Sequence, residues 1–86
     1  MISNKENPVE WAALMYELED ARDHLENLAK AMAEAGAIDE IDYSVDLGHV
    51  FAHLNRAWNI RDLTHEIPDN EWRKLSAFPM DLEPVG

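Results

Sequence analysis

Three side chains in the middle of the sequence have the types and the spacing of a metal-binding site. Asp46, His49 and His53 follow the pattern Asp-x-x-His-x-x-x-His, and residues three and four apart share one face of a helix. A carboxylate and two imidazoles are the ligands of many zinc and non-haem iron sites. His24 is a candidate fourth ligand from an earlier segment. In an antiparallel hairpin centred on residues 36–43, His24 would face a position near 55, close to the level of His53.

The same histidines have a simpler interpretation. Histidines four residues apart are also ordinary surface or interface residues, and nearby carboxylates in an acidic chain favour their protonated form. The pairs of Glu-x-x-His motifs that are typical of di-iron bundles do not occur in the sequence. The sequence therefore leaves both interpretations of the histidines open.

A second stretch combines polar and aromatic side chains that are common in protein–protein contacts. Its candidate interaction surface consists of Asn55, Arg56, Trp58, Asn59 and Arg61. Tryptophan and arginine are frequent anchors of interfaces, and asparagine in mid-helix is held there by something other than helix propensity. The alternative is that Trp58 belongs to the core and Arg61 bridges to the acidic first helix. We favour this alternative, because Trp58 falls on the apolar face of its predicted helix.

The residues that could do chemistry must be positioned by helices. Apolar residues recur three and four apart from Trp11 onward, which is typical of an amphipathic helix. Asn7 is a candidate N-cap, Pro8 suits the first helical position, and Gly36 suits a helix end. We therefore predict a helix over residues 8–35.

Two further helices are predicted within one helical domain that spans residues 1–86. The apolar pattern predicts a helix over residues 44–63, capped by Ser44 or Asp42, after a connection at 37–43. A shorter helix is predicted over residues 68–78, because acidic residues follow Pro68 and Pro79 ends the pattern. Residues 79–86 are predicted to form an extended tail.

No strand pattern occurs, so the predicted fold is all-α: a long antiparallel helical hairpin, a short third helix and a C-terminal tail. The apolar positions exceed what two helices can bury, and pairing of two hairpins into a four-helix-bundle-like homodimer would cover the surplus. The alternative is a monomeric three-helix arrangement in which the third helix and the tail cover it. The residues predicted to form the core and the helix contact are Trp11, Leu14, Leu18, Leu25, Leu28, Met32, Leu47, Phe51, Leu54 and Trp72.

Composition excludes several classes of function. The 86 residues include 18 acidic and 7 basic side chains, with a formal net charge of −11 and no cysteine. A binder of nucleic-acid backbone needs a clustered basic face, and disulfides or zinc–thiolate sites need cysteine. No apolar run reaches the roughly 18 residues of a membrane span, and no signal peptide is recognisable. We expect a cytoplasmic protein with no nucleic-acid or membrane partner.

Enzymatic residues are not recognisable in the sequence. The serines lie outside any nucleophile motif, and the three glycines are isolated rather than clustered in a phosphate-binding loop. We expect no enzymatic activity and no cofactor. The predicted function is helix–helix association, with a second copy or with another protein. Alternatives are a metal-binding bundle that uses Asp46, His49, His53 and His24, and an acidic inhibitor or nucleic-acid mimic.

Overall fold

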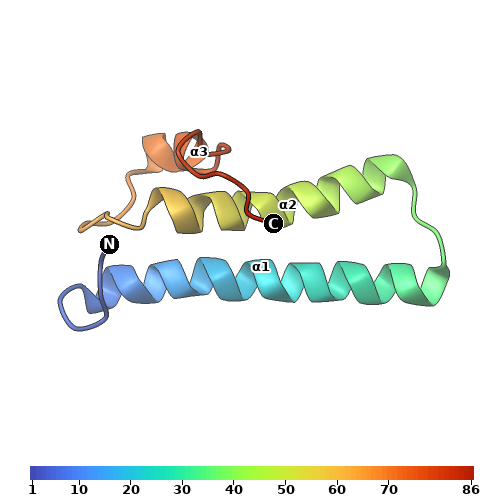
Figure 1. Ribbon diagram of the computed structural model, residues 1–86, viewed down its shortest axis with the longest axis horizontal. Helices are drawn as coiled ribbons and strands as arrows, with labels where there is room; N and C mark the ends of the chain where they lie inside the picture. The colour runs from blue at the N-terminus through green and yellow to red at the C-terminus, as the bar shows by residue number, and fades with distance from the viewer.

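The computed structural model describes residues 1–86 as two long antiparallel helices and a short third helix (Figure 1). Helix α1 spans Pro8–Ala35 and α2 spans Glu40–Asn59. A 3₁₀ turn, η1, at Asp69–Glu71 leads into α3 at Trp72–Leu75. The chain contains no strand, which confirms the all-α prediction. None of these helices has the length and the apolar content that crossing a membrane requires.

Helix α1 has the bounds that the sequence predicted. Pro8 occupies its first turn, where the missing N–H costs no hydrogen bond. Gly36 ends the helix with a φ of 71°, in the left-handed region that glycine adopts without steric cost. Its N–H donates to the Met32 carbonyl at 2.8 Å. The side chain of Asn7 makes no capping hydrogen bond, so the predicted side-chain cap is absent.

Helix α2 begins four residues before the predicted start at Ser44. Asp39 is the N-cap, and its carboxylate accepts hydrogen bonds from the N–H groups of Ile41 and Asp42. Asp39, Asp42 and Ser44 are all good capping residues, and the first of them takes the role. The connection between α1 and α2 is therefore shorter than predicted, which shifts the register of the hairpin.

The C-terminal elements are also shorter than predicted. Helix α2 ends at Asn59 rather than at residue 63, and residues 60–63 form a turn in which the Leu63 N–H donates to the Ile60 carbonyl. The helix predicted over residues 68–78 is confined to η1 and α3, because Ser76 caps the last turn with hydrogen bonds back to α3. Residues 79–86 contain no helix or strand.

The best-formed core lies at the end of the hairpin that holds the N-terminus. Leu14 and Ile60 are buried there with Ile2, whose N–H donates to the Arg61 carbonyl at 2.7 Å. Trp11, Leu63, Ile67 and Leu75 pack around them. Farther along the hairpin, the residues that bring the two helices into contact are Ala21, Leu28, Val50 and Ala57.

Half of the predicted core is less buried than expected. Leu14 and Leu28 are buried, and Trp11, Met32 and Leu47 are half-buried. The predicted core residues that stay between 39% and 48% exposed are Leu18, Leu25, Phe51, Leu54 and Trp72. Two helices cover only the side chains at their mutual contact, and one turn of α3 is too short to cover the rest. The predicted homodimer stays a prediction.

Candidate metal centre

Three histidines from two helices meet at one place on the hairpin. His24 comes from α1, and His49 and His53 come from successive turns of α2. Their ring centroids lie 4.0 Å apart for His24 and His49, 5.2 Å for His24 and His53, and 4.8 Å for His49 and His53. One ring nitrogen of each lies within 4.8 Å of the others. The structure thus brings together three of the four predicted ligands.

The hairpin register, which differs from the predicted one, brings His24 to this place. His24 packs against His49 and His53 rather than near position 55, because α2 starts early and the connection is short. Asp46, the fourth predicted ligand, is exposed and is not part of the histidine group. It lines an adjoining cavity of about 170 Å³ together with His24 and His49. His53 does not line this cavity.

His53 is the most buried of the three histidines, at 7% exposure. Its Nδ1 lies 3.2 Å from Oε1 of Glu17 in α1, and its Nε2 is buried without a hydrogen-bonding partner. Buried polar atoms without partners are rare in folded proteins. An imidazole that donates one N–H to a carboxylate and leaves the other nitrogen free has the arrangement of a metal-ligating histidine.

Arg56 competes with Glu17 for the same ring nitrogen of His53. Arg56 Nη2 lies 3.1 Å from His53 Nδ1, so it can donate only when Nδ1 carries no proton. When Nδ1 carries the proton, that N–H donates to Glu17 and Nε2 has a free lone pair. The second tautomer is the one that can bind a metal ion through Nε2.

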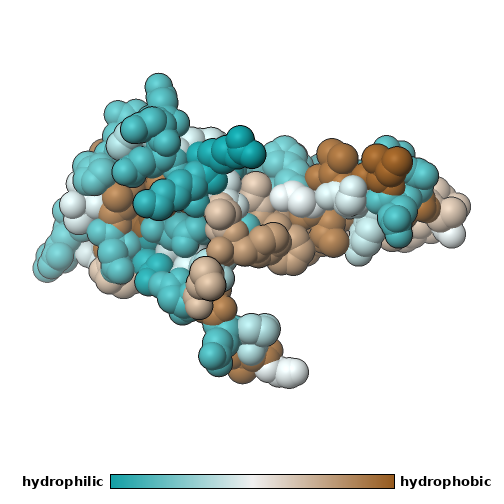
Figure 2. Space-filling view, turned by 90° about the horizontal axis from the view of Figure 1, so that it is seen from above, coloured by the Kyte–Doolittle hydropathy of each residue, from teal (hydrophilic) through white to brown (hydrophobic).

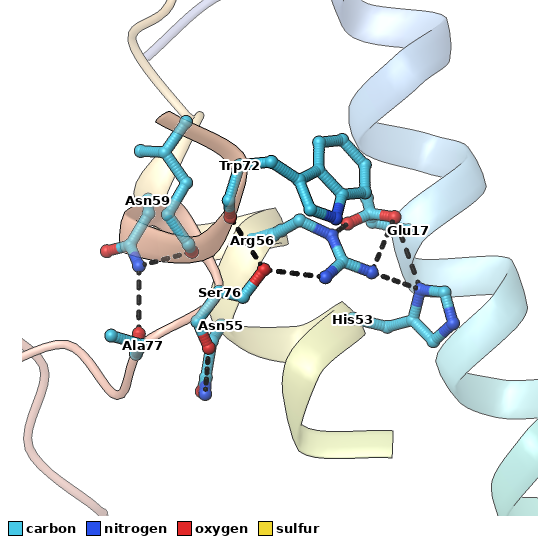
Figure 3. Close-up of polar contacts among 9 residues, drawn as sticks. Glu17, His53, Asn55, Arg56, Asn59, Trp72, Ser76 and Ala77 are labelled. Carbon is cyan, nitrogen blue, oxygen red and sulfur yellow. Dashed lines mark hydrogen bonds and ion pairs between the residues drawn. The ribbon is translucent and has the colours of Figure 1, made fainter. Parts of the chain in front are cut away.

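Glu17 and Arg56 form a buried ion pair behind His53 (Figure 3). Arg56 Nε donates to one carboxylate oxygen of Glu17, and Nη2 lies 3.4 Å from the other. Arg56 also donates to Ser76 Oγ at 2.8 Å, and its guanidinium lies 4.4 Å from the Trp72 ring centroid. These contacts hold the Glu17 carboxylate where it orients His53.

Sequence reasoning missed Glu17. The available signal is its position three residues after Leu14 and four before Ala21, on the buried face of α1. An acidic residue on such a face needs a buried partner. A chain with 18 acidic residues hides this signal, because most of them lie on solvated faces.

Electrostatics keep His49 in the neutral form that binds metals. Partial removal from water lowers the pKa of His49 below its usual 6.5. Positive charge on His24, His53 and Arg56 would lower this pKa further. Asp20 acts in the opposite direction. The net lowering favours a free ring nitrogen at neutral pH.

Carboxylates adjoin the three histidines on the α1 side. Glu17, Asp20 and His53 each place one ligand atom within 4.8 Å of the others. His53 belongs to this group and to the histidine group, so it is shared between them. Asp20 is exposed and can supply an oxygen ligand or a water-mediated contact to an ion held by the histidines.

The predicted interaction surface is occupied by the chain's own C-terminal segment. Asn55 donates to the Ser76 carbonyl at 3.0 Å, and Asn59 donates to the carbonyls of Leu75 and Ala77 at 2.8 and 3.1 Å (Figure 3). These bonds explain why two asparagines are kept within α2.

Trp58 and Arg61 also contact the tail. The Trp58 indole N–H donates to Asp81 at 2.9 Å, and Arg61 pairs with the same carboxylate at 3.1 Å. The Arg61 guanidinium stacks 3.8 Å from the Trp58 ring centroid. Trp58 is half-buried rather than part of the core, and Arg61 pairs with acidic residues outside α1.

The histidine group fits a tetrahedral ion after small side-chain rotations. Two nitrogens bound to one Zn²⁺ at about 2.0–2.1 Å lie about 3.3 Å apart in tetrahedral geometry. The three nitrogens, which lie within 4.8 Å of one another, have to converge by up to about 1.5 Å to meet this geometry. His24 and His49 are exposed enough to rotate.

No protein-family model, curated protein or solved structure matches the chain, so its function has to be inferred from its own residues.

Proposed function

We propose that the protein binds one divalent transition-metal ion through His24, His49 and His53. The observation that carries this proposal is the convergence of three imidazoles from two helices, with ligand atoms within 4.8 Å and one buried nitrogen that lacks a partner. Three neutral imidazoles suit Zn²⁺, Cu²⁺ or Ni²⁺, whereas Mg²⁺ and Ca²⁺ prefer oxygen ligands. Three protein ligands leave a fourth position for water, Asp20 or an external ligand.

Binding at this place would join α1 to α2. His24 belongs to one helix and His49 and His53 to the other, so an ion held by all three cross-links the hairpin near its middle. A ligand that binds only the folded chain raises its stability, by about 2.7 kcal/mol at a hundredfold excess over the dissociation constant. Glu17 supports the site by fixing the tautomer of His53, and it is a positioning residue rather than a ligand in this proposal.

Isothermal titration of the protein with zinc chloride tests the proposal. We expect one ion per chain and a rise in melting temperature on addition of zinc. His24→Gln and His49→Gln should each weaken binding by about tenfold or more, because each removes one of three ligands. The matched control is His65→Gln, since His65 is exposed and its Nδ1 lies beside the Glu66 carbonyl, outside the group. This control should bind zinc as the unaltered protein does.

Two results would refute the metal site. The first is the absence of binding heat together with a melting temperature that zinc leaves unchanged. The second is equal binding by the double variant His24→Gln/His49→Gln and by His65→Gln, which would indicate adventitious contacts with surface carboxylates. Far-ultraviolet circular dichroism of each variant verifies that the helices are intact.

A further inference from the structure

A regular sequence pattern places four leucines on one flank of the hairpin. Four residues in or near the histidine group are each followed by a leucine, in the dipeptides Glu17-Leu18, His24-Leu25, Asp46-Leu47 and His53-Leu54. Each following residue lies about 100° further around its helix. In two antiparallel helices that face each other, this rotation brings the following residue of each helix to the same flank of the pair. The leucines of both helices therefore share one flank, which we call the leucine flank, and the histidines lie toward the other.

The leucine flank is poorly covered by the rest of the chain. Leu18, Leu25 and Leu54 are 40%, 48% and 40% exposed. Beside Leu54, the tail and α2 form an apolar-lined groove of about 450 Å³ that includes Phe51 and Phe78. Figure 2 shows apolar residues along the middle of the molecule that continue into the base of the tail. Contiguous exposed apolar surface of this kind marks interaction sites.

The surface area of the chain indicates how much of it a partner would cover. The chain exposes 6643 Å². A compact monomer of 9.9 kDa is expected to expose about 5,200 Å². The excess of about 1,400 Å² exceeds the roughly 800 Å² that each partner buries in a standard interface and is in the range of obligate homodimers.

A basic residue lies on the leucine flank of this acidic chain. The net charge of −11 would repel a second copy if carboxylates lined the contact. Arg22 lies within one helical turn of both Leu18 and Leu25 on this flank, and it pairs with Asp23 at 3.5 Å. The carboxylates nearest the histidines, Glu17 and Asp20, lie toward the opposite flank.

We propose that the leucine flank is the interface of a two-fold symmetric homodimer, in which two hairpins form a four-helix bundle. A two-fold contact uses the same patch of both copies, and a stripe of leucines along both helices complements itself. The excess area belongs to the whole elongated molecule with its tail, and it is large enough to contain such a contact. This arrangement leaves both histidine groups on the outside of the dimer, so dimerisation does not depend on the proposed metal site.

Sedimentation equilibrium of the metal-free protein, in the presence of a chelator, tests the proposal. We expect a mass of twice 9.9 kDa at high concentration. Leu18→Glu/Leu25→Glu should raise the dimer dissociation constant by about a hundredfold or more, because unpaired charges are costly in an apolar interface. The matched control is Ile41→Glu in the first turn of α2, where Ile41 is 71% exposed and lies outside the leucine flank. This control should sediment as the unaltered protein does.

Three outcomes would overturn the dimer. One is a monomeric mass for the unaltered protein at every concentration, which would leave the flank uncovered or reserved for a different protein. Another is a dimer in the Leu18→Glu/Leu25→Glu variant as stable as in the Ile41→Glu control. The third is an equal loss of dimer in the Ile41→Glu control. Leu54→Glu repeats the test from α2, and circular dichroism identifies any variant that has lost its helices.

Discussion

Removal of one partner from the buried ion pair of Glu17 and Arg56 should be unusually destabilising, which Arg56→Met tests. Glu17 is 8% exposed and Arg56 is 6% exposed, so removal of the guanidinium leaves an unpaired carboxylate inside the protein. Breaking a buried pair in this way costs about 3–5 kcal/mol. A protein of 86 residues has a free energy of unfolding of about 4–13 kcal/mol. We therefore expect Arg56→Met to remove about a quarter or more of the total stability.

The double variant Glu17→Leu/Arg56→Met separates the ion pair from the packing around it. Replacing both charges by apolar side chains removes the desolvation cost of each and is often close to neutral. His53 then loses its polar neighbours at Nδ1, which costs about 1–3 kcal/mol. The double variant should therefore be more stable than Arg56→Met alone, with a coupling free energy of up to about 3 kcal/mol between the two sites.

Urea unfolding, followed by circular dichroism at one fixed protein concentration, measures these free energies. Arg73→Met is the matched control, because Arg73 is an exposed arginine of α3, and its effect should stay within about 0.5 kcal/mol. A cost below about 1 kcal/mol for Arg56→Met would refute the reasoning. Equality between the double variant and the sum of the single variants would refute it as well.

Three other predictions concern pH, the tail and two glycines. The pKa of His49 is lowered in the folded state, so the unfolded chain takes up the proton first as the pH falls. The stability of the metal-free protein should therefore fall as the pH drops below 6.5 and stay level above it. Thermal melting across pH should show this fall, and His49→Gln should reduce it. Asp81→Asn weakens the contact with Trp58 and should leave the free energy of unfolding almost unchanged, because the carboxylate is exposed. Tryptophan fluorescence and proteolysis of the tail should nevertheless both change. Gly48→Ala should stabilise α2 by about 0.5–1 kcal/mol, because the added Cβ meets no atom within 4 Å. Gly36→Ala should cost about 1 kcal/mol, because Gly36 has a positive φ. Urea midpoints of the two variants that move in the same direction would contradict this pair of predictions.

The sequence was most informative where several local signals agreed. Pro8, the heptad spacing and Gly36 all indicated the same bounds of α1, and the structure has those bounds. The start of α2 was harder to predict, because three capping residues, Asp39, Asp42 and Ser44, lie within six positions and local propensity does not choose among them. Because Asp39 is the N-cap, the connection between α1 and α2 is shorter than predicted, and the resulting register places His24 beside His49 and His53.

Partners within the chain were the hardest feature to predict. His49 and His53 were grouped correctly because helical spacing is local information, and His24 was placed near them by the expected antiparallel hairpin. The roles of Glu17 and Arg56 depend on which residues lie across the hairpin, and spacing alone does not contain that information. Likewise, Asn55 and Asn59 were candidates for a surface that contacts another protein, whereas in the structure they bind residues 75–77 of the same chain.

The way the two asparagines hold the C-terminal segment has a consequence for sequence change. Asn55 and Asn59 bind main-chain carbonyls of Leu75, Ser76 and Ala77, and every amino acid carries that group. These three contacts therefore depend on the backbone of the segment and not on its side chains, whereas Ser76 is also held through its hydroxyl, which accepts from Arg56. Exposed positions such as Ala77 should accept wide substitution, by evolutionary drift or by design, while the segment stays attached through α2.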